Sequence, residues 1–347
     1  MKILVTGGFG YIGAVMIQKL AEHGIKSIVY DKGLFCNDFI TEQVGSIPSK
    51  VIYKEINDIS VDDLNGVDAV FHLAAISNDP CAELSVEDTM RVNVNGTIAV
   101  ANACIKAGIP LYYASTASVY GQKEWACVTE DEPQLNPQST YGRSKVKAEE
   151  ALLELSYNNP GFNPIIFRQS TVYGYSPRMR YDLVVNTFFK DAMLYKQIHV
   201  FGGGEVFRPL VSVDDIANAY ITAIQIQKDL KRPEIINLVH ENYYILSLAF
   251  LMQDLLYTNH NIKAEVIIDR TQSKDSRNYA ISDVKACNLG IYCPISIEYA
   301  LDNMMYHWQQ GHCADFDNPI YYNHRYTKLL QQVQQYIKNI PAWETIP

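Results

Sequence analysis

The chain has 347 residues, with 29 Lys and Arg against 38 Asp and Glu, and a formal net charge of -9. This acidic balance argues against nucleic acid or a membrane surface as a partner, because phosphate binding needs a basic surface. The seven cysteines include no C-x-x-C pair and the eight histidines are scattered, so we expect neither a disulfide framework nor a metal site. No apolar run approaches the roughly 18 residues of a membrane span, and we expect a cytoplasmic protein.

Short apolar runs alternate with amphipathic stretches in the first half of the chain. Buried strands are predicted at residues 2–6, 27–31, 51–55, 68–73, 111–114 and 164–168. Helices are predicted at residues 11–23, 86–107 and 140–155. Strands and helices in alternation are typical of an α/β fold with a parallel sheet and right-handed crossovers.

The pattern changes beyond about residue 175. Shorter elements follow, with strands predicted at 199–202 and 265–268 and helices at 213–226, 247–256, 297–308 and 326–337. We therefore divide the chain into domains at residues 1–175 and 176–347, with some exchange of strands and helices between the two.

A glycine-rich segment, Thr-Gly-Gly-Phe-Gly-Tyr-Ile-Gly at residues 6–13, follows the first predicted strand and opens the first predicted helix. Gly7 allows a tight turn, Gly10 lets the backbone approach a pyrophosphate, and Gly13 lets the helix pack closely on the sheet. The free N–H groups of the helix start favour phosphates. The cofactor-binding residues expected here are Gly7, Gly10, Tyr11, Ile12 and Gly13. The segment predicts a Rossmann doubly wound parallel sheet that binds a dinucleotide, followed by a smaller mixed α/β C-terminal substrate domain.

Asp31 ends the second predicted strand, where a carboxylate accepts hydrogen bonds from the adenosine ribose. It would repel a 2′-phosphate by on the order of 4 kcal/mol at ~4 Å and an effective dielectric near 20, which favours NAD over NADP. Lys32 would soften this preference. Further cofactor contacts are expected from Asp58 and Ile59 after the third strand, and from Leu73, Ala74 and Ala75 at the end of the fourth.

Tyr141 and Lys145 lie four residues apart at the start of a predicted helix, and therefore on one face of it. A tyrosine has an ordinary pKa near 10, and two cations, the Lys145 ammonium and the ring of NAD⁺, would each lower it by about two units at ~5 Å. The resulting phenolate takes the proton of a hydroxyl group while hydride leaves for NAD⁺. Thr116, at the end of the fifth strand, is placed to hydrogen-bond the same substrate oxygen.

These motifs resemble those of the extended short-chain dehydrogenase/reductases, in particular the NAD-dependent epimerase/dehydratase family that acts on nucleotide-diphosphate sugars. The resemblance runs from residue 1 to about residue 310. Besides the motifs above, it rests on His-Leu-Ala-Ala at 72–75, Asn-Val-Asn-Gly-Thr at 93–97, Ser-Thr-Ala-Ser-Val-Tyr-Gly at 115–121, and the segments 201–215 and 274–279.

The resemblance implies a role for residues in both domains. It makes Thr116, Tyr141 and Lys145 the catalytic residues, with NAD as cofactor and with Tyr141 and Lys145 also among the residues that bind it. It implies a substrate site that includes Ser118, Arg180, Arg208, Asp275 and Arg277, with Arg208 and Arg277 near the diphosphate of the nucleotide sugar. It also implies a homodimer formed through the helices at 86–107 and 140–155. Ile98, Val100 and Leu152 are among the candidate contacts, although each could equally face its own sheet.

The sequence departs from the family pattern at several positions. Sugar 4,6-dehydratases carry Asp-Glu directly after the catalytic Thr, and decarboxylases keep the Glu, whereas this chain has Ala117 and Ser118. The amide usually found three residues beyond the strand arginine, here Arg168, is missing, and Asp182 stands where epimerases often have an amide. Arg178 or Arg180 would then replace the missing contact with the diphosphate, as in a subgroup of sugar epimerases and reductases from surface-polysaccharide biosynthesis.

The leading interpretation is an NAD-dependent 4-epimerase, an isomerase that oxidises sugar carbon 4 and reduces it again. A 4-ketosugar reductase or a sugar 4-dehydrogenase is the alternative from the same family, because its catalytic residues are identical. A non-catalytic dinucleotide-sensing protein is a second alternative. Such proteins typically lose the Tyr or the Lys, and this chain keeps both.

Overall fold

The computed structural model of the chain describes residues 1–123, 127–271 and 278–339. A parallel sheet of seven strands lies at its centre, in the order β11-β7-β5-β4-β1-β2-β3. The strands are β1 (Lys2–Thr6), β2 (Lys26–Asp31), β3 (Lys50–Tyr53), β4 (Ala69–His72), β5 (Leu111–Thr116), β7 (Ile165–Gln169) and β11 (Glu234–Leu238). The strand order reverses between β1 and β4, which opens a crevice at the carboxyl ends of these strands. The predicted Rossmann sheet is confirmed.

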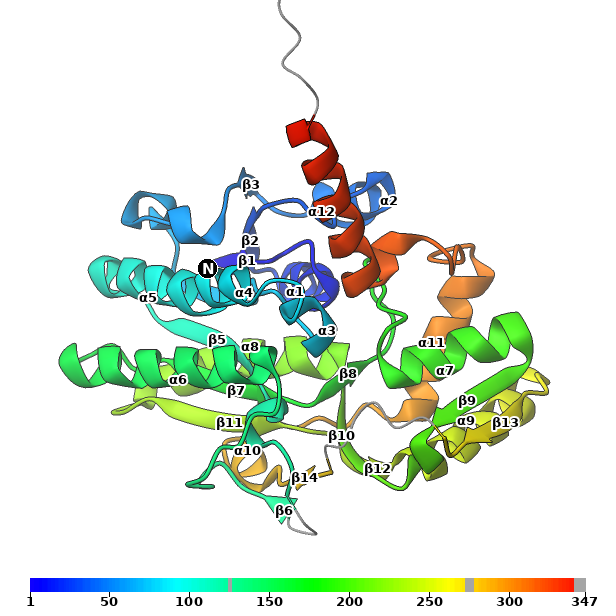
Figure 1. Cartoon of the computed structure of the whole chain (residues 1–347). Helices are drawn as coiled ribbons and strands as arrows, with labels where there is room; N and C mark the ends of the chain where they lie inside the picture. Colours follow the sequence, from blue (N-terminus) through cyan, green and yellow to red (C-terminus); the bar gives the residue numbers. More distant parts are fainter. Residues whose placement is uncertain (124–126, 272–277, 340–347) are drawn as a thin grey trace, which may run out of the picture.

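Helices cover both faces of this sheet (Figure 1). On one face, α1 (Tyr11–Glu22) and α8 (Val213–Ile226) pack against side chains such as Val5 and Phe71. On the other, α5 (Gly96–Ala107) and α6 (Thr140–Asn158) pack against side chains such as Leu4. Burial on both faces explains why the strands are apolar along their whole length rather than alternating.

Two residues offered as dimer contacts lie inside this core. Val100 of α5 and Leu152 of α6 are fully buried against the chain's own sheet. Of the two possibilities open for these residues, they face their own sheet, and their burial leaves no surface for contact with a second subunit. Ile98 is half-buried. Leu153 and Tyr157 are the large apolar side chains of α6 that are exposed to solvent.

The predicted helix at residues 86–107 is interrupted. It begins as α4 (Val86–Met90), passes through a π turn at Arg91–Asn95, and continues as α5. The side-chain amide of Asn93, inside the π turn, donates to the carbonyl oxygen of Ile76 at 3.0 Å and accepts from its N–H at 2.8 Å. The π turn therefore places Asn93 where its side chain can hold the loop that follows β4.

The second half of the chain builds smaller sheets and also contributes to the first domain. Its remaining strands are β8 (Thr171–Tyr173), β9 (Gln197–Phe201), β10 (Phe207–Ser212), β12 (Glu241–Tyr244), β13 (Glu265–Asp269) and β14 (Ala280–Ile281), which pairs with β6 (Cys127–Val128). Its helices are α7 (Val184–Tyr195), α9 (Ile245–His260), α10 (Val284–Asn288) and α11 (Ile297–Gln309). Because β11 joins the central sheet and α8 packs on α1, residues beyond 175 complete the sheet and the helix layer that the first 175 residues begin.

Two short helices are α2 (Asp38–Ile40), which follows β2, and α3 (Asp79–Ala82), which borders the crevice; α12 (Asn323–Asn339) lies near the end of the described chain. Figure 1 shows α12 beside α2 and above α3, both of which come from the first 175 residues of the chain. Within the described ranges, no helix is both long and apolar enough to cross a membrane.

Candidate active site

A cleft of about 980 Å³ opens at the carboxyl ends of β1, β4 and β5. Its walls come from the glycine-rich loop, the ends of these strands, the start of α6, the second domain and α12. The cleft therefore runs across the point where the strand order reverses, which is where open α/β sheets bind their ligands.

The glycine-rich loop has the geometry that the sequence predicts. Gly7 has a φ of +71°, and a Cβ there would lie 2.8 Å from the backbone of Ala74. A Cβ on Gly13 would lie 2.2 Å from the carbonyl oxygen of Gly7, so any side chain would push α1 off the loop. At Gly10, apart from its two neighbours in the chain, the only atom of the described residues within 4 Å of such a Cβ is the Gly7 oxygen at 3.2 Å, which leaves the loop open toward the cleft. This backbone fits a dinucleotide pyrophosphate.

Asp31 is held at the rim of the same cleft. Its Oδ1 accepts from the N–H of Gly33 at 2.7 Å and its Oδ2 from the N–H of Phe9 at 3.1 Å. Burial raises the pKa of this carboxyl group, against the effect of these hydrogen bonds and of nearby Arg178. The ammonium of Lys32 forms an ion pair with Glu55 instead of neutralising Asp31. The arrangement fits an NAD ribose with free hydroxyls.

The other expected cofactor contacts divide into two groups. Leu73, Ala74 and Ala75 line the cleft, and the Thr6 hydroxyl accepts from the first two N–H groups at 3.2 Å. Asp58 and Ile59 are not among the residues that line it. A 3-10 turn at Ile56–Asp58 follows β3 and carries Ile59 into the core beneath α5, while Glu55 and Ile56 face the cleft in their place.

The three expected catalytic side chains meet in the cleft. Thr116 ends β5, where its hydroxyl accepts from the N–H of Ser118 at 3.2 Å and forms a hydrogen bond with Tyr141. One turn along α6, the Lys145 ammonium donates to the carbonyl oxygen of Ala114 at 2.6 Å and lies 5.8 Å from the centre of the Tyr141 ring. All three residues line the cleft, as does Ser118.

Helix α3 fixes the start of α6, and with it the position of Tyr141. The hydroxyl of Ser139 caps α6 by accepting from the N–H of Gly142 at 3.0 Å, and it donates to the carboxylate of Asp79. Glu83 accepts from the N–H of Thr140 at 2.9 Å. Sequence reasoning missed this support, although the Asn-Asp-Pro segment at 78–80 is a turn signal that marks the start of a short helix.

The pKa values of the two catalytic side chains move opposite to the simple expectation. Burial raises the pKa of Tyr141 to about 12, with a contribution from Asp79, while Arg180 and the hydrogen bond with Thr116 oppose the rise. Burial also lowers the pKa of Lys145 to about 7, against the attraction of Glu149. In the protein alone Tyr141 is thus a neutral phenol at pH 7, and its deprotonation depends on the positive charge that NAD⁺ brings.

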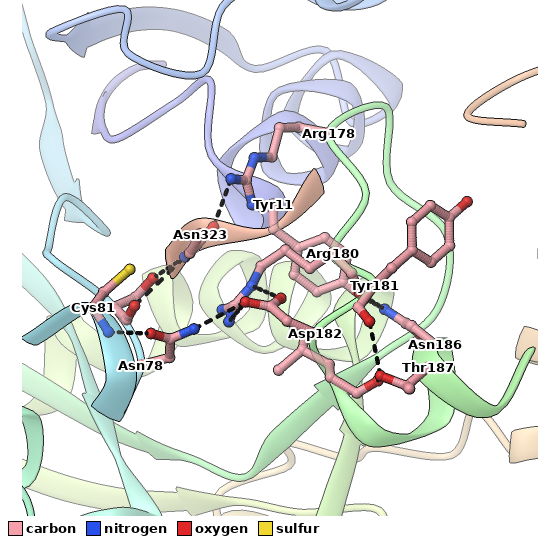
Figure 2. A network of polar contacts seen from close by, with 12 residues as sticks. Tyr11, Asn78, Cys81, Arg178, Arg180, Tyr181, Asp182, Asn186, Thr187 and Asn323 are labelled. Carbon is pink, nitrogen blue, oxygen red and sulfur yellow. Dashed lines mark hydrogen bonds and ion pairs between the residues drawn. The ribbon is translucent and has the colours of Figure 1, made fainter. Parts of the chain in front are cut away.

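On the substrate side, the structure separates the arginines. Arg208 lines the cleft from β10 and donates to the carbonyl oxygen of Phe207 at 2.8 Å. Arg180 also lines the cleft, but its Nε and Nη2 donate to the carboxylate of Asp182 at 2.9 and 3.1 Å, and Asn78 donates to the same carboxylate at 2.9 Å (Figure 2). Its charge is therefore already matched within the chain.

Arg178 faces a different part of the cleft. Its guanidinium stacks on the ring of Phe35, with its central carbon 3.9 Å from the ring centre, and donates to Asn323 of α12 at 2.5 Å. Both partners lie on the side of Asp31 rather than that of Arg208. Asp275 and Arg277, also expected in the substrate site, lie outside the described residues. Nor do three or more His, Cys, Asp or Glu side chains gather as a metal site in the described ranges.

A parallel sheet of this order, a glycine loop at its switch point and a Thr–Tyr–Lys set on β5 and α6 define an NAD-dependent enzyme of the Rossmann class. The model of the NAD dependent epimerase/dehydratase family matches residues 3–238, and the chain belongs to that family. The UDP-glucose 4-epimerase of Azospirillum brasilense is 30% identical over 245 residues, which cover 64% of this chain and 68% of that protein.

Two solved structures are similar over nearly the whole chain. The UDP-glucose 4-epimerase of Thermotoga maritima, solved with UDP-glucose, is 25% identical with a TM-score of 0.77, and the match covers 90% of this chain and 99% of that one. The UDP-glucuronic acid 4-epimerase of Bacillus cereus, solved with UDP-glucuronic acid and NAD, is 25% identical with a TM-score of 0.76, covering 89% and 99%. The expected family and the NAD cofactor are confirmed.

Proposed function

We propose that the protein is an NAD-dependent 4-epimerase of a nucleotide-diphosphate sugar. The observation that carries the proposal is the meeting of Thr116, Tyr141 and Lys145 in the cofactor cleft, with no carboxylate directly after Thr116. This set handles one hydroxyl proton and offers no second acid/base pair in that segment. The similarity to 4-epimerases of two sugars supports the same reaction.

Each catalytic side chain has a defined task at the sugar hydroxyl. Bound NAD⁺ supplies the hydride acceptor, and in its reduced form the hydride donor. Tyr141 takes the proton of the 4-hydroxyl as hydride leaves and returns it when hydride comes back. The hydroxyl of Thr116, already bonded to Tyr141, holds the substrate oxygen in line with the phenol. The hydrogen bond from Lys145 to Ala114 fixes the ammonium below the Tyr141 ring, where it stabilises the phenolate.

The segment after Thr116 argues against dehydration. Elimination of water across carbons 5 and 6 needs a base and an acid beside those carbons, and the side chains there are the methyl group of Ala117 and the hydroxyl of Ser118. Ala117 is buried and carries no group that could accept or donate a proton. Asp79, a carboxylate that lines the cleft, accepts the hydrogen bond of Ser139 and supports α6.

The diphosphate of the substrate is assigned to Arg208. This side chain reaches the cleft from the second domain, and a guanidinium binds phosphate oxygens through parallel N–H groups. Arg180 is the weaker choice, because Asp182 accepts from two of its nitrogens. The expectation that Arg178 serves the same diphosphate is not supported by its contacts with Phe35 and Asn323.

The test is a panel of UDP-, dTDP-, GDP- and CDP-hexoses incubated with the purified protein and followed by NMR. We expect one nucleotide sugar to give its carbon 4 epimer without accumulation of NADH. A 6-deoxy-4-keto product would assign a dehydratase. Conversion that consumes NAD⁺ or NADH in proportion to substrate would assign the alternative 4-dehydrogenase or 4-ketosugar reductase.

A further inference from the structure

Helix α12 forms part of the wall of the cofactor cleft. Asn323, His324, Thr327, Leu330, Gln331 and Gln334 line the same cleft as the glycine-rich loop and Asp31. Most of these positions recur every three or four residues, so one face of α12 is turned toward the cleft. Nothing in the family motifs of this chain assigns a role to this helix.

The helix is tied to both sides of the groove that holds the adenosine half. On the side of α3, Asn323 donates to the hydroxyl of Ser77 at 2.8 Å, and the thiol of Cys81 lies 3.8 Å from the hydroxyl of Thr327. On the side of Asp31, the rings of Phe35 and Tyr326 lie with their centres 5.5 Å apart. Since α12 contacts both walls, it bridges the groove from one to the other.

Arg178 lies beneath this bridge and forms no ion pair with a described carboxylate, although the charges of Asp31 and Asp182 act on it from a longer distance. Its side chain is only 1% exposed, although it lines the cleft, and its Nε has no hydrogen-bond partner in the described part of the chain. The residues that hold it are Phe35 and Asn323 (Figure 2). Burial lowers its pKa to about 9, with a contribution from Arg180. A buried guanidinium without a direct ion pair is costly, which points to a bound anion as the missing partner.

The position of Arg178 favours binding to the phosphates of the cofactor over those of the substrate. The N–H of Arg178 donates to the hydroxyl of Ser176 at 3.2 Å, and that hydroxyl donates to the carbonyl oxygen of Tyr11 at 2.7 Å. Arg178 is therefore fastened to the first turn of α1, where the glycine-rich loop presents its N–H groups. Arg208, assigned above to the substrate diphosphate, reaches the cleft from β10 of the second domain.

We infer that α12 is a clasp over the dinucleotide groove, in which Arg178, held by Asn323, binds the NAD pyrophosphate and α12 must move before the cofactor can leave. Such a clasp keeps NAD bound from one turnover to the next. Retention of NAD between turnovers suits an enzyme that regenerates its own cofactor, and this part of the inference rests on the proposed function. The binding of NAD by Arg178 and α12 does not rest on the proposed function, because it concerns the cofactor alone.

The first experiment measures affinity with Arg178→Met, which removes the charge and keeps most of the side-chain volume. The matched control is Arg325→Met, which removes an exposed guanidinium from α12, outside the lining of the cleft. We expect Arg178→Met to weaken binding of NADH and of ADP-ribose by about 10- to 100-fold, the usual range for a hydrogen-bonded charge, and to leave UDP binding unchanged. Weaker UDP binding with unchanged NADH binding would assign Arg178 to the substrate and overturn the inference.

The second experiment fastens the clasp reversibly in the full chain. Thr327→Cys places a thiol opposite Cys81, and oxidised glutathione can join the two. Release of preloaded NADH, chased with excess NAD⁺ and followed by fluorescence, should slow at least about tenfold in the oxidised variant and recover with dithiothreitol. The matched control, Thr327→Cys with Cys81→Ser, cannot form the bond. Equal release rates before and after oxidation, or free thiols that fail to join, would each contradict the clasp. Neither readout requires epimerase activity, so failure here is distinct from failure of the proposed reaction.

Discussion

Replacing Lys145 with Met should remove catalysis and also change how stability depends on pH. Lys145 is 2% exposed, and burial lowers its pKa from 10.5 to about 7. Between these pH values the unfolded chain binds a proton that the folded protein does not. The free energy of unfolding therefore rises with pH, because the penalty for burying the charged ammonium disappears. This rise in the free energy of unfolding is complete above pH 10.5 and is lost as the pH falls through 7.

The size of this effect follows from the shift. One pKa unit corresponds to ~1.4 kcal/mol, so the free energy of unfolding of the wild type should rise by about 2 kcal/mol relative to Lys145→Met between pH 7 and pH 9. At pH 7 the variant loses the hydrogen bond to Ala114, worth about 1–3 kcal/mol for a charged donor, and no longer buries an ammonium at a cost of about 4 kcal/mol. We therefore expect a variant that is inactive and at least as stable as the wild type at pH 7.

Urea unfolding at pH 7, 8 and 9, on protein freed of cofactor, measures the difference. Lys147→Met is the matched control, because Lys147 lies on the same helix and is exposed. Its unfolding free energy should parallel that of the wild type at all three pH values. If the curves for Lys145→Met and wild type also ran parallel, the buried ammonium would not be the titrating group and the reasoning would fail.

Three further changes test the roles of single side chains. Tyr141→Phe keeps the ring and removes the proton acceptor, so kcat should fall by at least about 100-fold while calorimetry shows NADH binding within twofold of wild type; near-normal turnover would rule Tyr141 out as the base. Asp31→Asn removes the charge that repels a 2′-phosphate, and parallel titrations should show the preference for NAD over NADP narrowed by at least tenfold, an outcome that an unchanged ratio would contradict. Arg208→Ala should weaken UDP or GDP binding, whichever the wild type prefers, by roughly 10- to 150-fold with NADH affinity unchanged, and equal nucleotide affinity would move the diphosphate site to Arg180.

The sequence predicts the parts of the molecule that local rules govern. The glycine-rich loop and the Tyr141–Lys145 spacing depend on backbone geometry over a few residues, and both are found where they are expected. Asp58 and Ile59 differ because a 3-10 turn sets their direction, and a short turn of this kind leaves no periodic signal. The interrupted helix around Asn93 has the same cause, since the bonds that widen it reach Ile76 in a distant segment.

Contacts between distant segments account for what the sequence leaves open. The pairing of Arg180 with Asp182 is local, but which arginine meets the cofactor depends on how residues 176–180 pack against α1 and α12. The amphipathic pattern of the last helix predicts that it forms, with bounds close to those observed, but not the surface on which it lies. Burial likewise decides that the pKa of Lys145 falls, which its spacing from Tyr141 alone would not show.

The most direct test of the account follows one hydrogen atom. The nucleotide hexose that the protein converts is prepared with deuterium at carbon 4, and the product is analysed by NMR and mass spectrometry. An epimerase that passes hydride to bound NAD⁺ and takes it back predicts deuterium retained at carbon 4 of the epimer, no exchange with solvent and no labelled NADH in solution. Deuterium found at carbon 6, or released as labelled NADH with a 4-keto sugar left behind, would contradict the proposed epimerase.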